Sequence, residues 1–142
     1  MGGTCAPPVG PPSNGFERVL DRYTNLTAPF LRGCYVFLTV AAVWFASRAL
    51  GSPVGLLVEG AFFLVFGTYC LANFARCREA HCIVTGVGWS ALAIVTVAAV
   101  LAGHDIRGGA WTAFVVIALA GHGFEAIWKA RYGSNALRLR RV

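Results

Sequence analysis

The chain has 142 residues, of which 57% are hydrophobic and only 13% charged, with a mean hydropathy of +0.65 and a formal net charge of +6. A water-soluble domain carries about a quarter charged residues, so this composition excludes an ordinary soluble protein. The apolar excess is concentrated in four long stretches that begin after the first thirty or so residues.

The N-terminal part of the chain contains no such stretch. Residues 1–15 are rich in Gly and Pro, and we expect them to form a disordered tail. Residues 16–32 are expected to form an amphipathic segment at the membrane surface, with Phe16, Val19 and Leu20 on its apolar side. No signal peptide is expected, because a central apolar run is absent from this part.

The four apolar stretches predict helices at about 33–50, 54–77, 83–103 and 109–131. Each approaches the ~20 residues that cross a hydrocarbon core about 30 Å thick. Helices that are apolar on every face are buried or lie in lipid. We therefore predict an all-α integral membrane protein with a four-transmembrane-helix bundle over residues 33–131 and a basic tail at 132–142.

The basic residues gather on one side of the predicted membrane. Ten of the twelve lie in the N-terminal segment, in the connection between the second and third helices, and at the C-terminal end, while Arg48 and Arg107 occupy the other two connections. The positive-inside rule then places both termini in the cytoplasm, in a multi-pass protein of the cytoplasmic (inner) membrane. This distribution explains the net charge without nucleic acid, and the basic tail is expected to contact anionic lipid headgroups.

The connection between the second and third helices contains the sequence RCREAHC, residues 76–82. A cytoplasmic location keeps thiols reduced, so no structural disulfide between Cys77 and Cys82 is expected. If the second helix continues past the membrane surface, as the absence of Gly and Pro favours, Cys77 and His81 lie at i and i+4 on one face. Thiolate and imidazole ligands suit Zn(II), Cu(I) and other soft ions. A charged turn that only follows the positive-inside rule is the simpler interpretation.

The second helix also carries a row of polar and sulfur-bearing residues. At ~100° per residue, Glu59, Cys70, Asn73 and Cys77 fall on one face, with phenylalanines between the first two. Polar groups inside the hydrocarbon are costly and seldom face lipid. Such a row is therefore what a path for ions would need.

Other helices add candidates in the predicted inner half of the membrane. The first helix contributes a cysteine near its start, and the fourth places a histidine and a glutamate on one face. The complete set of candidate metal ligands is Cys77, His81, Cys82, Cys70, Cys34, His122, Glu125 and Glu59. Simpler interpretations stay open, in which Glu125 pairs with Lys129, Glu59 pairs with Arg48, and the membrane cysteines serve as apolar packing residues.

One string in the middle of the chain reads Asn73-x2-Arg76-Cys77-x3-His81-Cys82-x2-Thr85-Gly86. It resembles a motif of small prokaryotic multi-helix membrane proteins of unassigned function, and the resemblance implies family membership without an activity. In general plan the chain is also similar to mercuric-ion transport proteins, which pass the metal inward along cysteines. That family has a vicinal cysteine pair in its first helix, where this chain has Cys34 alone.

Together these features favour transport or sensing of a thiophilic metal ion, Hg or Cu and less readily Zn, by relay along Cys, His and Glu ligands. No catalytic residue is assigned, because no Ser-His-Asp order and no phosphate-binding glycine loop occurs, and an enzyme is not favoured. Two alternatives remain. The first is an accessory subunit that packs against partner helices of a membrane complex or forms a homo-oligomer. The second is a membrane thiol-redox protein that uses Cys77 and Cys82.

Overall fold

The structure is a computed structural model of the chain. It describes Gly15, Arg18 and residues 29–137, without the side chains of residues 29–32, 76 and 77. The expected disordered tail and amphipathic segment therefore lie almost wholly outside the described residues, as does the end of the basic tail, residues 138–142.

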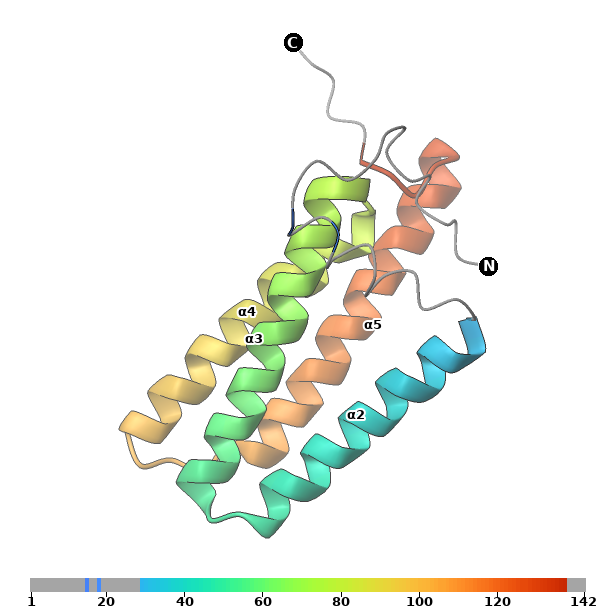
Figure 1. Ribbon diagram of the computed structural model, residues 1–142. Helices are drawn as coiled ribbons and strands as arrows, with labels where there is room; N and C mark the ends of the chain where they lie inside the picture. The colour runs from blue at the N-terminus through green and yellow to red at the C-terminus, as the bar shows by residue number, and fades with distance from the viewer. Residues whose placement is uncertain (1–14, 16–17, 19–28, 138–142) are drawn as a thin grey trace. The chain divides into compact units, whose positions relative to one another are not determined.

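The regular structure of the described residues is helical, and the connections contain one isolated backbone bridge. The helices are α2 (Pro29–Ala49), α3 (Ser52–Cys77), α4 (Ala80–Leu101) and α5 (Arg107–Tyr132) (Figure 1). Three segments, Ser52–Ala75, Ala80–Leu101 and Arg107–Tyr132, are long and apolar enough to cross a membrane, whereas the apolar part of α2, Gly33–Ala49, is shorter. The prediction of an all-helical protein with apolar, membrane-length helices is confirmed. The fourth crossing and the side of the termini stay predictions.

The chain divides into two units, residues 1–42 and residues 43–142. The first unit contains the beginning of α2, where Phe37 and Leu38 are largely exposed, as expected of side chains that face lipid. The second unit contains the end of α2 together with α3, α4 and α5, and within it α4 packs against both α3 and α5 (Figure 1).

Small residues set the spacing of the helices in the second unit. A Cβ atom on Gly67 of α3 would lie 2.5 Å from Ser90 Oγ and 2.7 Å from Ser90 N on α4. On α5, a Cβ atom on Gly121 would lie 2.6 Å from Thr85 Cγ2 of α4. Helices in a membrane associate through close van der Waals packing, which small residues permit. These glycines therefore allow α3 and α5 to approach α4 closely.

An aromatic layer fills the middle of this three-helix packing. Phe63 is fully buried and stacks on Phe114 with ring centroids 5.4 Å apart, and Phe114 stacks in turn on Trp89 at 4.7 Å. The same layer includes Phe62, Phe66 and Trp111. It lies between Glu59 and Cys70 along α3, so the helix face that was expected to offer an ion path is packed with rings at this level.

The chain reverses direction between α3 and α4 at Arg78. This residue has a left-handed backbone with φ of 53°, and its N–H donates to Phe74 O at 2.8 Å. Non-glycine residues seldom adopt this conformation, and no Gly or Pro marks the position. The helix therefore does not continue through His81, so the condition under which Cys77 and His81 would lie at i and i+4 of one helix is not met.

The segment that follows α5 pairs with this reversal. Leu137 N–H donates to Arg78 O at 2.8 Å, and Asn135 O accepts a hydrogen bond from Ala80 N–H at 2.9 Å. The first N–H groups of a helix have no partner within the helix, so the second bond satisfies a donor at the start of α4. The beginning of the predicted basic tail is thus part of the fold.

We expect Gly67→Ala to destabilise the packing of α3 on α4, because the added methyl group would overlap backbone and side-chain atoms of Ser90. Overpacking of this kind costs about 1–3 kcal/mol. Reversible unfolding of the purified protein in detergent measures the loss. Gly123→Ala is the matched control, because nothing lies within 4 Å of a Cβ atom at that position. Equal stability of the two variants would contradict the close approach at Gly67.

Candidate metal centre

Groups able to bind a metal gather where α3 ends, α4 begins and the last third of α5 passes. Glu79 is the N-cap residue of α4, and His81 and Cys82 lie in the first turn of that helix. Glu125 reaches the same place from α5. These residues share one end of the packed helices because α5 runs antiparallel to α4 (Figure 1).

Three donor atoms of this group form a compact triangle. Cys82 Sγ lies 3.3 Å from His81 Nε2 and 3.9 Å from Glu79 Oε2, and the last two atoms are 3.9 Å apart. In a tetrahedral site with Zn–S, Zn–N and Zn–O bonds of ~2.3, ~2.0 and ~2.1 Å, donor atoms are about 3.4 to 3.6 Å apart. The observed separations lie within about 0.5 Å of these values. One ion can therefore be shared by the three side chains with little movement.

Two residues of α3 support this triangle. Asn73 Nδ2 lies 3.3 Å from Glu79 Oε2 and 3.2 Å from Cys82 Sγ, so one amide group donates hydrogen bonds to two of the three candidate ligand atoms. Cys70 hydrogen-bonds with Cys82 and with Thr85 through its thiol. Cys82 itself is 1% exposed, so these hydrogen bonds form in a buried environment, where the low dielectric constant strengthens them.

The opposite edge of the His81 ring faces α5. His81 Nδ1 lies 2.5 Å from Glu125 Oε2, a contact with the distance of an ion pair but without the angle of a hydrogen bond. The His122 ring stacks on the His81 ring with centroids 4.9 Å apart, and His122 Nδ1 lies 4.0 Å from the same carboxylate oxygen. A carboxylate on the second nitrogen of a metal-binding histidine fixes its tautomer and orientation. Glu125 is thus placed to aim His81 Nε2 at the triangle.

The reversal at Arg78 brings Glu79 into the centre. In a continuous helix Glu79 and His81 would project ~200° apart. Here Glu79 has an extended backbone, with φ of −63° and ψ of 133°, and forms an antiparallel bridge with Ala136. Sequence reasoning missed Glu79 because, for this connection, it considered only the i and i+4 spacing that a continued helix would give to Cys77 and His81. The available signal was the run E-A-H-C, which places a carboxylate, an imidazole and a thiol within four residues.

Within residues 43–142, the structure brings some of the predicted ligands together and keeps Glu59 apart from them. Cys34, partly exposed, belongs to the first unit, and Cys77 is the last residue of α3 with a side chain outside the described part. Glu59 lies on α3 about 16 Å from Cys70, at a rise of 1.5 Å per residue. The candidates that lie together are Cys70, His81, Cys82, His122 and Glu125. Whether each binds a metal stays a prediction.

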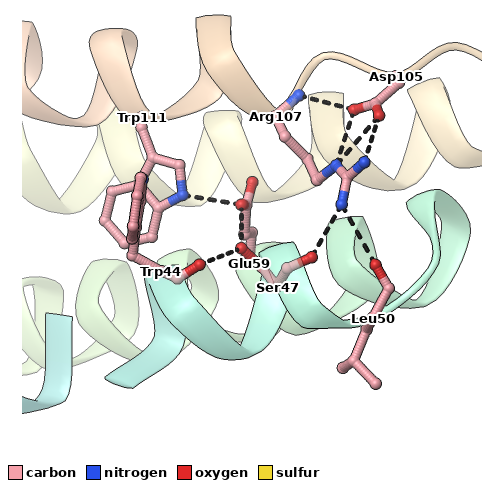
Figure 2. Close-up of polar contacts among 7 residues, drawn as sticks. All are labelled: Trp44, Ser47, Leu50, Glu59, Asp105, Arg107 and Trp111. Carbon is pink, nitrogen blue, oxygen red and sulfur yellow. Dashed lines mark hydrogen bonds and ion pairs between the residues drawn. The ribbon is translucent and has the colours of Figure 1, made fainter. Parts of the chain in front are cut away.

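The expected partners of the two glutamates differ from the observed ones. Glu125 contacts His81 and His122 rather than Lys129. Glu59 is fully buried beside Ser47 Oγ, at 2.7 Å, and accepts a hydrogen bond from Trp111 Nε1 at 2.8 Å (Figure 2). Neither Ser47 nor Trp111 was predicted as a partner of Glu59, because a serine and a tryptophan in apolar helices are usually packing residues.

Arg107 is the prominent cation near Glu59, and it is held by other groups. It donates to Asp105 through Nε and Nη2, with Nη2 2.6 Å from Asp105 Oδ2, and Nη1 donates to Ser47 O at 2.8 Å and to Leu50 O at 3.3 Å (Figure 2). These guanidinium hydrogen bonds hold the pKa of Asp105 well below its usual range. Arg107 thereby ties the α4–α5 connection to the end of α2.

Comparison of the chain with family models, with curated proteins and with solved structures finds no match. The functional argument therefore depends on the side-chain geometry of the described residues.

Proposed function

We propose that the protein binds a transition-metal ion through Glu79, His81 and Cys82, and that this binding serves transport or sensing of a thiophilic metal at the cytoplasmic membrane. The observation that carries the proposal is the compact triangle of Glu79 Oε2, His81 Nε2 and Cys82 Sγ. A thiolate, an imidazole and a carboxylate together suit a borderline ion such as Zn(II). Three protein ligands leave a fourth position for an exchangeable ligand, which transfer of an ion requires.

A softer ion would engage Cys70 as well. Its thiol already contacts Cys82, so a small movement would offer a second thiolate to the same ion. Two thiolates with an imidazole suit Cu(I), and by the same softness Hg(II). The identity of the ion thus depends on whether Cys70 joins the triangle.

The position of the centre supports sensing of the ion, or its release to the cytoplasm, more directly than passage of the ion along α3. It lies at the α3–α4 reversal, which the positive-inside rule assigns to the cytoplasmic side. Toward the other end of α3, the stacked rings of Phe63 and Phe114 fill the interior. Sensing or release needs the centre alone, whereas passage along α3 would also require these rings to separate.

We expect the purified full chain in detergent to bind Co(II), used as a spectroscopic substitute for Zn(II), with thiolate-to-cobalt absorption. His81→Gln and Cys82→Ser each remove a ligand and should weaken binding by more than about 100-fold, the upper end for loss of an outer-shell partner. The matched control is His104→Gln, which changes a histidine outside the centre, in the connection between α4 and α5, and should bind as the wild type does.

Undiminished binding by both ligand variants would reject the proposed site. The same samples test a thiol-redox alternative in which Cys70, which contacts Cys82, takes the place of the Cys77 that the sequence suggested. Absence of metal binding, combined with loss of two alkylatable thiols at Cys70 and Cys82 after treatment with a disulfide oxidant, would replace the metal proposal by that alternative.

Glu125→Gln should weaken metal binding about 10- to 100-fold while the thiolate-to-cobalt absorption persists, because the ligands remain but the carboxylate that orients His81 is lost. Equilibrium titration with Co(II) measures both quantities. Lys129→Gln is the control on the same helix, since it removes the cation that the sequence offered as an alternative partner of Glu125. An equal loss in the two variants would argue against an orienting role for Glu125.

A further inference from the structure

The His81 ring has two nitrogen atoms, and the triangle uses only one of them. Nε2 faces Cys82, whereas Nδ1 faces Glu125 and is buried without a hydrogen-bond partner among the described residues. Buried polar atoms nearly always have such a partner, and an exception has a physical reason. Nδ1 is therefore a second ligand atom that this ring can offer to an ion.

Two side chains of α5 complete a second group of ligands around Nδ1. Glu125 Oε2 lies 2.5 Å from His81 Nδ1 and 4.0 Å from His122 Nδ1, and one ligand atom from each of the three residues lies within 4.8 Å of the other two. With Zn–N and Zn–O bonds of ~2.0 and ~2.1 Å, ligand atoms of a tetrahedral site are about 3.4 Å apart. The two measured distances lie on either side of this value. A displacement of the carboxylate by about 1 Å toward His122 would let the three side chains share an ion.

Exposure distinguishes this second group from the triangle. The side chain of His122 is 68% exposed, whereas Cys82 is 1% exposed. Both groups lie at the same level of the packed helices, because the His122 ring stacks on the His81 ring. Imidazoles within apolar helices are costly, and such residues usually mark the path of an ion or a substrate. The second group therefore connects the surface of α5 with the buried triangle.

The ring of His81 can serve only one of the two groups at a time. In a neutral imidazole one nitrogen carries the hydrogen and the other offers a lone pair. When Nδ1 binds an ion, Nε2 carries the hydrogen and cannot join the triangle. When Nε2 binds the ion instead, the hydrogen lies on Nδ1 and faces Glu125. The two groups are therefore alternative positions for one ion.

We propose that His81, His122 and Glu125 form a second metal site, the α5 site, which receives the ion at the surface and passes it to the triangle. Transfer exchanges the two nitrogens of His81, with the ion moving from Nδ1 to Nε2 and the ring proton moving from Nε2 to Nδ1. Imidazole and carboxylate ligands hold a thiophilic ion less strongly than a group that includes a thiolate, so transfer toward Cys82 is favoured. The transfer, but not the α5 site, rests on the proposed function of the triangle.

Residual binding in a variant without the thiolate tests the α5 site by itself. Cys82→Ser removes a ligand of the triangle and spares the α5 site, so the full chain in detergent should still bind Co(II), more weakly and without absorption from the Cys82 thiolate. Addition of His122→Gln to this variant should weaken the remaining binding at least about 10-fold, whereas addition of His104→Gln should not. Equilibrium dialysis measures both. Glu79→Gln, which also spares the α5 site, replaces Cys82→Ser if that variant does not fold.

Rapid mixing of the full chain with Co(II) tests the transfer. His122→Gln alone should slow the rise of the thiolate-to-cobalt absorption by a larger factor than it weakens binding at equilibrium, because His122 serves entry of the ion and is not a ligand of the triangle. His104→Gln is the control and should show the rate of the wild type.

An unchanged rate in His122→Gln would overturn the transfer, and residual binding that does not depend on His122 would overturn the α5 site, while the triangle would stand in both cases. Failure of the triangle gives a different result. Binding of Co(II) that depends on His122, in a wild type without thiolate-to-cobalt absorption, would reject the triangle and the transfer and support the α5 site.

Discussion

The left-handed backbone of Arg78 determines the geometry of the proposed metal centre. It ends α3 at Cys77, allows α4 to begin at Ala80 and leaves Glu79 between the two helices. The donors of the triangle come from this N-cap residue and the first turn of α4. A straight helix through the segment would distribute them around its axis, because each residue advances ~100°.

The apolar stretches predicted the helices well because lipid imposes one requirement on each of them. Backbone hydrogen bonds must close within the segment, and apolar side chains must face outward, so the helix can be read from the sequence it occupies. His122 and Glu125 could likewise be assigned to one face from their spacing of three. The place of Glu79 could not, because the reversal at Arg78 is stabilised by Asn135 and Leu137, which lie far away in the sequence.

The row of polar and sulfur-bearing residues expected along α3, from Glu59 to Cys77, is interrupted by aromatic packing. At one end Asn73 and Cys70 meet the donors of α4, and at the other end Glu59 meets Ser47 and Trp111. Between them, rings such as that of Phe63 fill the interior, because aromatic side chains bury a large area and pack edge to face or offset. Periodicity identified a buried face correctly but could not distinguish a packed face from a hydrated path.

The backbone pairing beyond α5 has a consequence for how the protein matures. Asn135 and Leu137 follow α5 in the chain, so the ribosome delivers them after the apolar helices. The α3–α4 reversal therefore gains the hydrogen bonds of Asn135 and Leu137 only after α5 has been made. Until then the first N–H groups of α4 lack these partners, which is costly in or near lipid. Completion of the proposed metal centre is therefore deferred to the end of biogenesis.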